Sequence, residues 1–376
     1  MVDMAQIAYR GSASIDELLP ALEQYAGRHI LLVRGKRSYE ACGAKRHFDA
    51  IFKALGISVS EFFDFEENPR EPDLQRGLSL FGAFPISAVV AVGGGSVLDM
   101  AKLLRFFHAY VGEIDTGNYR KDGELLPLIV LPTTAGTGSE ATRFAVLYRN
   151  KVKYSVEHDS ILPDKVIVYP PFTYDNPPYL TACTGFDALA QAIEAFWNVN
   201  ATEESECFAR RAITLLWPNL PVAVSAPTPE VRDQVSEGAY WAGRAINITK
   251  TTAPHAFSYP FTSYYGYPHG HAVALLFPYI AGYNIRNGHI RSLQNILGLD
   301  DEPEVCFRNY VYALGLAPRI SDESFDPEVI VSNINLNRLK NNPVPIDSRT
   351  AYDFMERLNA AVRARSRMDF SSSAAL

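Results

Sequence analysis

The sequence predicts an α/β domain with a parallel sheet, followed by an all-α domain. Three observations predict this fold class. Short β-rich runs alternate with amphipathic helical runs through the first half of the chain, which is the pattern of strand–helix–strand units. Prolines cluster at 170–171 and 177–178, and they mark a boundary near residue 178. Beyond this boundary the patterning is helical, so we expect domains at 1–178 and 179–376.

The strands expected in the first half are short runs of branched aliphatic and aromatic residues. They lie at 30–33, 57–63, 88–92 and 128–131, with a further β region at 152–156 and 165–168. Amphipathic runs between them predict helices at 38–55, 73–84 and 97–110. Ser38 is the expected N-cap of the first helix. Because helices separate successive strands, the sheet should be parallel and covered on both faces.

The second half begins with helical runs at 181–197, 203–215 and 229–246. The chain has 376 residues, a net charge of −7 and 47% hydrophobic residues, as an ordinary globular protein does. Without a dense Lys/Arg cluster, this acidic balance argues against a nucleic-acid partner. Four scattered cysteines fit a reducing cytoplasm. We recognise neither a signal peptide nor a stretch of about 20 apolar residues that would span a membrane.

Two loops rich in small residues follow neighbouring strands. The first is a glycine-rich turn at 93–96, where a helix N-terminus would offer backbone amides to a phosphate, at Gly94, Gly95 and Ser96. The second loop, 132–140, reads PTTAGTGSE and offers the hydroxyls of Thr133, Thr134, Thr137 and Ser139. A glycine run is also simply a good turn. Two such loops at the carboxyl edge of a parallel sheet nevertheless predict a bound nucleotide.

These two loops also carry a resemblance to a known family. Residues 93–102, GGGSVLDMAK, resemble the GGGSxxDxAK motif of the iron-containing (group III) alcohol dehydrogenases, and the loop 132–140 and the PHG at 268–270 resemble further signatures of that family. The resemblance implies a dinucleotide-binding domain, a helical domain and a divalent metal between them, an architecture shared with dehydroquinate synthase. It also implies that Asp99 and Lys153 lie at the cofactor. The family often forms dimers, so a homodimer is an open expectation.

The turn after the first strand bears on the choice of nicotinamide cofactor. An acidic residue at this strand end binds the ribose 2′-hydroxyl of NAD, and NAD-using relatives resemble this stretch with Asp where Gly35 stands. Here Arg34, Lys36 and Arg37 crowd the turn instead. Cations fit a 2′-phosphate through charge-assisted hydrogen bonds, so NADP(H) is favoured over NAD(H). A solvated basic turn is the alternative.

The expected metal ligands come from three segments. Asp187 and Gln191 stand four residues apart on one predicted helix, so their side chains point the same way. The family pattern is DxxxH followed by two later histidines, and Asp187, His255 and His269 match three of its four positions. Gln191 stands where most relatives have His, and its carbonyl oxygen is a harder, weaker ligand than imidazole. The resemblance implies Fe²⁺ or Zn²⁺, completed by Gln191 or water, and a metal-independent enzyme stays open.

Two residues depart from the family pattern near the expected nicotinamide. Tyr259 stands where many relatives have a second His, four residues after His255. There are two alternatives for Tyr259: its hydroxyl transfers a proton, or its ring only lines the pocket. His271 would be a displaced proton relay or a hydrogen-bonded core histidine. With a metal polarising a carbonyl oxygen and a nicotinamide donating hydride, the predicted reaction is the reduction of an aldehyde.

The substrate is predicted from unusual polar residues. Lys250 stands among hydroxyls that include Thr251 and Ser258, and Arg143 follows the second cofactor loop. Such cations fit an anionic head group. The strings KTTAPHAxSYxxT, PHGHAV and DALxQAIE resemble a phosphonate branch of the family, which implies reduction of phosphonoacetaldehyde to 2-hydroxyethylphosphonate in phosphonate metabolism. A helix-end lysine facing water is the alternative for Lys250.

Other functions stay open from the sequence. One is the reduction of another small aldehyde, carboxylated or neutral. A cyclase similar to dehydroquinate synthase would share the cofactor, the metal and both domains, but the loop 132–140 and the PHG signature look like those of the dehydrogenases. A nucleotide-binding pseudoenzyme would have lost His at positions 191 and 259, yet three ligand positions remain.

Overall fold

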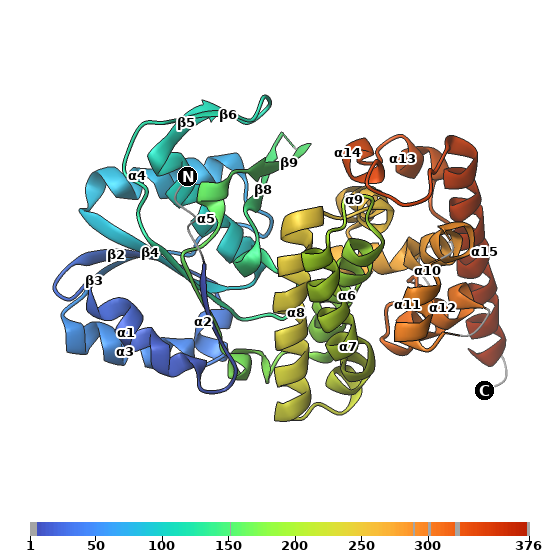
Figure 1. Ribbon diagram of the computed structural model, residues 1–376, viewed down its shortest axis with the longest axis horizontal. Helices are drawn as coiled ribbons and strands as arrows, with labels where there is room; N and C mark the ends of the chain where they lie inside the picture. The colour runs from blue at the N-terminus through green and yellow to red at the C-terminus, as the bar shows by residue number, and fades with distance from the viewer. Residues whose placement is uncertain (1–5, 151, 289, 300–301, 320–323, 374–376) are drawn as a thin grey trace.

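A computed structural model describes residues 6–150, 152–288, 290–299, 302–319 and 324–373. It has two parts that lie beside each other (Figure 1): an α/β part built from the first half of the chain, and a bundle of helices built from the second half. The helical part begins at Pro178, the first residue of α6. The predicted fold class, a parallel-sheet α/β domain followed by helices, is confirmed.

The α/β part is organised by a six-stranded sheet in which every pairing is parallel. The strand order is β1-β10-β7-β4-β2-β3. The strands are β1 (Ile7–Arg10), β2 (His29–Arg34), β3 (Ser58–Phe62), β4 (Ile86–Gly93), β7 (Leu128–Pro132) and β10 (Lys165–Val168). The chain steps from β2 outward to β3, and then β4 returns to the opposite side of β2. The strand order therefore reverses between β2 and β4, where open α/β sheets bind ligands at their carboxyl edge.

Helices cover both faces of this sheet, because its central strands are apolar on both sides. Residues 88–92 of β4 are fully buried. One face packs against α1 (Leu18–Glu23) and α3 (Ala44–Leu55), and the other against α4 (Glu71–Ala83) and α5 (Gly95–Ala109). Two antiparallel hairpins complete this part: β5 (Tyr110–Glu113) with β6 (Asn118–Lys121), and β8 (Phe144–Arg149) with β9 (Val152–Glu157).

The helix predicted at 38–55 is wrong in one respect. The structure has two helices there, α2 (Ser38–Ala41) and α3, because Gly43 has φ of 79°, in the left-handed region, and breaks the helix. Ser38 is the first residue of α2 rather than its N-cap. The N-cap position belongs to Arg37, and no side chain caps the helix.

The helical part packs around α6 (Pro178–Trp197), whose residues 185–197 are all buried. Its neighbours α7 (Glu203–Ser225) and α8 (Pro229–Thr249) extend past their predicted ends. Pro218 and Pro221 lie inside α7, where packing against α6 and α8 outweighs the lost backbone bonds. The remaining helices are α9 (Ala253–Tyr265), α10 (His269–Gly288), α11 (Arg291–Leu297), α12 (Pro303–Ala313), α13 (Pro327–Val331), α14 (Leu336–Leu339) and α15 (Ser348–Ser373). Within the described ranges, no helix has the length and apolar character to cross a membrane.

Candidate active site

Three side chains from separate helices converge on one point. Asp187 lies in the middle of α6, His255 in the first turn of α9 and His269 at the start of α10. Their ligand atoms all lie within 4.8 Å of one another. His255 Nε2 is 3.0 Å from Asp187 Oδ1, and His269 Nε2 is 3.8 Å from the same oxygen. About a third of the His269 side chain is exposed (32%) while the other two are buried, so the cluster opens to solvent beside His269.

Gly270 explains why this convergence needs the PHG sequence. A Cβ atom at Gly270 would lie 1.9 Å from the carbonyl oxygen of Cys183 in α6. Only glycine therefore lets the start of α10 approach the backbone of α6, and this approach brings His269 to Asp187.

The donor set of this cluster fits a divalent metal ion. Two imidazoles and a carboxylate are ligands that Zn²⁺ and Fe²⁺ accept. Gln191, one turn after Asp187 on α6, is also buried. Its Nε2 lies 3.4 Å from the Thr137 carbonyl oxygen, while its Oε1 is buried without a hydrogen-bond partner in the described part of the chain. An unsatisfied buried carbonyl oxygen is costly, and a cation would satisfy it.

Glu194 is a site residue that the sequence reasoning missed. It is fully buried, and its Oε2 accepts a short hydrogen bond from His255 Nδ1. Its Oε1 accepts from the Thr252 amide at 2.8 Å and the Thr252 hydroxyl at 2.9 Å. This carboxylate fixes the tautomer of His255 and leaves Nε2 as the ligand atom. One signal was available: Glu194 follows Asp187 by seven residues, on the same face of one helix.

Protonation follows from these contacts. Burial alone would lower the pKa of His255, but Glu194 and Asp187 together raise it to about 10. Burial lowers the pKa of His269 to about 3, against the attraction of Asp187. Without a metal, His255 therefore holds a proton between two carboxylates, and neutral His269 presents a free lone pair. Metal binding displaces such a proton, so the arrangement fits a cation site.

Tyr259 lies beside the cluster, as the sequence analysis expected. Its ring stacks over that of His269, with the centroids 6.1 Å apart and the planes 17° from parallel. Lys153 Nζ, from β9, lies 3.9 Å from the centroid of the Tyr259 ring. Burial would raise the pKa of Tyr259, but the charges of Lys153, Arg338 and His255 hold it below the usual value of 10. The hydroxyl is therefore a better proton donor than an ordinary tyrosine.

The two predicted cofactor loops pack against each other at the carboxyl edge of the sheet. Gly94 is the N-cap of α5, without a side-chain cap, so the first amides of this helix remain for a ligand. A Cβ atom at Gly95 would lie 2.6 Å from the Thr137 side chain, and one at Gly94 would lie 3.4 Å from Thr134 Oγ1. Thr133 Oγ1 is buried with no partner among the described residues. The geometry fits a phosphate group held by backbone amides and hydroxyls.

Asp99, Ser139 and Ser96 form hydrogen bonds between the loops at the carboxyl edge of the sheet. Asp99 accepts hydrogen bonds from the Ser139 hydroxyl at 2.5 Å and from the Val146 amide at 3.0 Å. Ser96 Oγ accepts from the Asn68 amide at 3.0 Å. These bonds hold one loop to another, and the expected contacts of the three side chains with the cofactor stay predictions.

Lys102, the last residue of the glycine-rich motif, is the anchor of this arrangement. It is fully buried, and Nζ donates to four acceptors between 2.6 and 3.1 Å away: Ser139 O, Ser139 Oγ, Thr142 Oγ1 and Phe144 O. Burial lowers its pKa to about 8. The motif lysine thus positions the second cofactor loop rather than touching a phosphate.

The turn after β2 carries three cationic side chains, and one of them has no ion-pair partner among the described residues. Gly35 is buried there, and a Cβ atom would lie 2.0 Å from Ser38 Oγ, so an acidic side chain fits only if Ser38 moves. Arg34 pairs with Glu61 at 2.7 Å, and Lys36 pairs with Asp64 at 3.2 Å. Exposed Arg37 forms no ion pair within the described ranges.

The structure corrects the predicted substrate grip at Lys250 and Arg143. Lys250 Nζ pairs with Glu157 Oε2 at 2.5 Å, and Arg143 pairs with Asp159 at 3.0 Å and with Glu157 at 3.7 Å. Two carboxylates thus balance the two cations. Lys250 also has φ of 64° and ψ of −175°, a strained turn that ends α8 and directs the chain into α9. The Lys250–Glu157 pair joins the helical part to the β8–β9 hairpin, and both cations already have carboxylate partners.

Three further predicted residues also have structural roles. His271 bonds Tyr179 OH through Nδ1 at 2.9 Å and Ala317 O through Nε2 at 3.0 Å, as a buried core histidine does. Ser258 donates its hydroxyl to the His255 carbonyl at 2.9 Å and is fully buried. Thr251 is buried, and its carbonyl accepts from Asn341 Nδ2 at 3.0 Å. His271 therefore fits the alternative of a hydrogen-bonded core histidine, and Ser258 bonds within its own helix. The substrate role of Thr251 stays a prediction, because this contact uses its carbonyl and not its hydroxyl.

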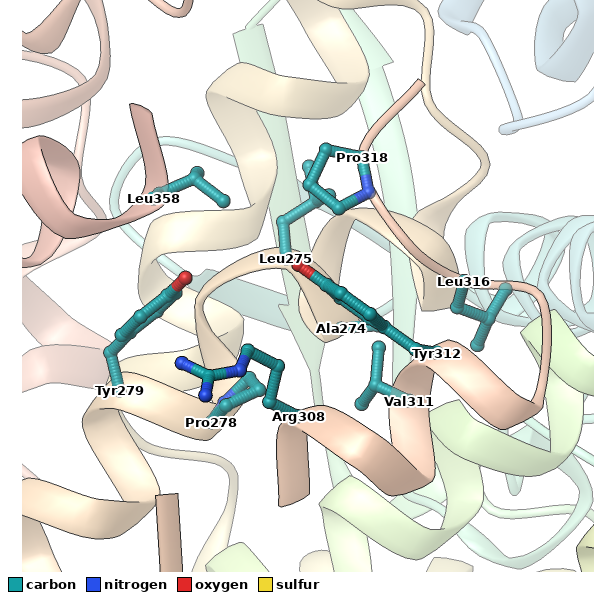
Figure 2. A pocket seen from close by; sticks show the side chains of 10 residues that line it. All are labelled: Ala274, Leu275, Pro278, Tyr279, Arg308, Val311, Tyr312, Leu316, Pro318 and Leu358. Atoms are coloured by element: carbon teal, nitrogen blue, oxygen red, sulfur yellow. The ribbon is translucent and has the colours of Figure 1, made fainter. Parts of the chain in front are cut away.

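A hollow between α10, α12 and α15 lies apart from this cluster (Figure 2). Its walls are mostly apolar, and Arg308 is the only charged side chain among the described residues that line it. These lining residues include no carboxylate or imidazole, so they do not offer a metal site.

Known proteins resemble this chain over most of its length. The family profile for iron-containing alcohol dehydrogenases matches residues 5–170, and the profile for the C-terminal region of the Fe-containing alcohol dehydrogenase family matches residues 181–323. A long-chain-alcohol dehydrogenase of Geobacillus thermodenitrificans is 32% identical over 283 residues, covering 74% of this chain and 71% of that protein. A 1,3-propanediol dehydrogenase of Klebsiella pneumoniae is 34% identical over 266 residues, covering 69% of this chain and 68% of that protein.

A solved structure agrees with the fold as well. The sulfoacetaldehyde reductase of Bifidobacterium kashiwanohense, in complex with NAD⁺, superposes with a TM-score of 0.85 at 30% identity, covering 96% of this chain and 99% of that one. Membership of the family implies NAD(H) and a divalent metal, which the cluster of Asp187, His255 and His269 fits. This chain belongs to the iron-containing alcohol dehydrogenase family, and it is an oxidoreductase that acts on CH–OH groups with a nicotinamide cofactor.

Proposed function

We propose that the protein reduces a small aldehyde with a strongly acidic head group, in the first place phosphonoacetaldehyde to 2-hydroxyethylphosphonate. The observation that carries this proposal is unbalanced positive charge beside the metal ligands. Lys153 Nζ lies 3.9 Å from the ring centroid of Tyr259, and no carboxylate pairs with Lys153 in the described part of the chain. A neutral aldehyde would leave this charge without a partner, whereas an anionic head group compensates it.

A second candidate substrate is sulfoacetaldehyde. The similar structure from Bifidobacterium kashiwanohense is a sulfoacetaldehyde reductase. Sulfonate and phosphonate are both tetrahedral oxyanions, and on a two-carbon aldehyde they present nearly the same shape. The two substrates differ in charge near neutral pH, because a phosphonate takes a second negative charge and a sulfonate does not. This difference separates them in a kinetic comparison.

The chemistry divides between the bound groups and the chain. When bound, a divalent cation at Asp187, His255 and His269 supplies Lewis-acid polarisation, and the nicotinamide supplies the hydride. Hydride addition at the carbonyl carbon leaves an alkoxide oxygen that needs one proton. In this proposal Tyr259 donates the proton, which is supported by the position of its ring against His269 and by its lowered pKa. Glu194 keeps the ring of His255 in a fixed orientation throughout.

The cofactor preference that we propose is NADP(H). The free Arg37 at the end of β2 and the absence of an acidic side chain at Gly35 support it. A 2′-phosphate would pair with Arg37, whereas the 2′-hydroxyl of NAD(H) would find no carboxylate at position 35.

The proposal is tested by measuring kcat/KM for four aldehydes with both cofactors. The aldehydes are phosphonoacetaldehyde, sulfoacetaldehyde, succinic semialdehyde and propionaldehyde, each with NADPH or NADH and with added Fe²⁺, Zn²⁺ or chelator. We expect phosphonoacetaldehyde to exceed propionaldehyde by about 10²-fold, since charge-assisted bonds contribute about 1.5–3 kcal/mol each. We expect NADPH to exceed NADH and Arg37→Ala to remove that difference. Equal rates for neutral and anionic aldehydes would reject the substrate, and full activity in chelator would reject the metal.

Tyr259→Phe tests the proton donor. The substitution keeps the ring that stacks on His269 and removes only the hydroxyl, so we expect kcat to fall by about 10²-fold with little change in KM. The loss should diminish at low pH, where solvent supplies protons more readily. An unchanged kcat would assign Tyr259 to the pocket wall alone.

A further inference from the structure

Arg338 is a cation that no part of the sequence analysis singled out. It lies in α14, and its Nη1 atom is buried without a hydrogen-bond partner among the described residues. A buried donor to which nothing bonds costs about 1–3 kcal/mol. Arg357 of the helical part, by contrast, is paired with Glu304. The guanidinium of Arg338 also hydrogen-bonds Tyr259, so its free Nη1 donor lies beside the cluster and is available to a bound group.

Hydrogen bonds place Arg338 beside the metal cluster. The amide of Asn335, the N-cap of α14, donates to the Ala256 carbonyl at 3.2 Å, one residue after His255. Asn335 Oδ1 accepts from the Arg338 amide at 3.1 Å. Asn341, just after α14, donates to the Thr251 carbonyl at 3.0 Å. The helix that carries Arg338 is therefore tied at both ends to the segment that leads into α9.

The guanidinium also reaches the α/β part. Arg338 Cζ lies 5.6 Å from the centroid of the Phe144 ring in β8. Lys153 lies on the paired strand β9, with Nζ over the ring of Tyr259. In Figure 1 the β8–β9 hairpin faces the side of the bundle where α9 and α14 lie. Two cations that form no ion pair within the described residues, one from each part of the molecule, thus meet around Tyr259, to which Arg338 is hydrogen-bonded.

We propose that Arg338 and Lys153 together hold the anionic head group of the substrate, with Arg338 supplying the forked, two-bond contact. This inference rests on the proposed function and names the residues that perform it. The planar fork of a guanidinium matches two oxygens of a phosphonate or sulfonate, whereas an ammonium acts as a point charge. The cations Lys250 and Arg143 do not compete for this role, because Glu157 and Asp159 already balance them. An anion held between Arg338 and Lys153 also joins the two parts of the molecule across the substrate.

The test compares Arg338→Met and Arg338→Lys with wild type on phosphonoacetaldehyde, sulfoacetaldehyde and propionaldehyde. For Arg338→Met we expect KM for both anionic aldehydes to rise about 30-fold and KM for propionaldehyde to change less than about threefold, while kcat falls for all three aldehydes because Arg338 no longer lowers the pKa of Tyr259. Arg338→Lys keeps the positive charge but lacks the forked guanidinium. Its KM for the anionic aldehydes should therefore lie between those of wild type and Arg338→Met. Arg349→Met, which removes an exposed charge on α15, is the matched control and should resemble wild type. A second measurement is the inhibition of propionaldehyde reduction by ethylphosphonate. We expect the inhibition constant to rise in Arg338→Met and not in the control Arg349→Met.

The outcomes separate the two proposals. If wild type shows no preference for anionic aldehydes, the proposed function fails. If wild type prefers them and Arg338→Met retains the full preference, the function stands and the inference about Arg338 is wrong. If Arg338→Met raises KM for all three aldehydes equally while Arg338→Lys keeps the wild-type values, Arg338 supports α14 structurally and binds no head group.

Discussion

Replacing His269 by alanine is expected to remove the bound metal and to lower kcat/KM by about 10³-fold or more, which corresponds to about 4 kcal/mol of transition-state stabilisation. His269 is the most exposed of the three clustered ligands, so its loss leaves the core of the helical part intact. The remaining pair, Asp187 and His255, is already joined by a hydrogen bond of 3.0 Å and has lost its third partner. Elemental analysis after dialysis and steady-state kinetics measure the two effects.

Gln191→His adds a ligand to the same metal site, whereas His269→Ala removes one. It supplies an imidazole where the chain now offers an unpartnered carbonyl oxygen, and we expect metal affinity to increase by about 10-fold to 100-fold. Metal retained at the wild-type level in His269→Ala, or wild-type activity in a protein shown to be free of metal, would contradict the proposed cation site.

Replacing Lys102 by methionine is expected to destabilise the protein by about 3–5 kcal/mol, because it leaves buried polar groups without their charged partner. Four acceptors around Nζ lose their donor, and buried Glu140 loses a nearby positive charge. The loop 132–140 is held by these bonds, so the dissociation constant for NADPH should rise as well. Urea unfolding and cofactor fluorescence titration measure the two quantities.

The control for this change is Lys45→Met on the surface of α3. Lys45 pairs only with Asp49, four residues away, and both side chains are about half exposed. Removing it should leave both stability and cofactor binding unchanged within error. If Lys102→Met proves as harmless as Lys45→Met, the second cofactor loop does not depend on the buried amine.

Local patterns in the sequence predicted the elements of the fold well. The central strands β2, β4 and β7 are continuous apolar runs because helices cover both faces of the sheet, and such runs are visible without a structure. The break at Gly43 was missed, because a glycine inside an amphipathic pattern becomes a left-handed turn only when the surrounding packing demands it. The continuation of α7 past Pro218 was missed for the converse reason, since packing stabilised a helix that local propensity would end.

The candidate metal ligands were predictable through their motifs, while the network around them was not. Asp187, His255 and His269 occupy positions of a known family pattern, and the structure brings them together. Glu194 carries no motif of its own, and its bond to His255 joins residues 61 positions apart. Lys250 and Glu157 are 93 positions apart, so the sequence showed a lone cation where the structure has an ion pair.

The sequence by itself determined the alternation of central strands and helices, the glycines at the cofactor loops and the residue types of the ligand cluster, although it did not indicate β1 or the β5–β6 hairpin. These features depend on periodicity, backbone conformation and chemistry that each segment carries locally. Only the tertiary structure decided which charges are free. It paired Lys250 and Arg143 with carboxylates, enclosed His271 in the core, and placed Lys153 and Arg338 beside Tyr259 with no carboxylate partner among the described residues. Electrostatic interactions depend on distance through space, and that distance bears no fixed relation to separation along the chain.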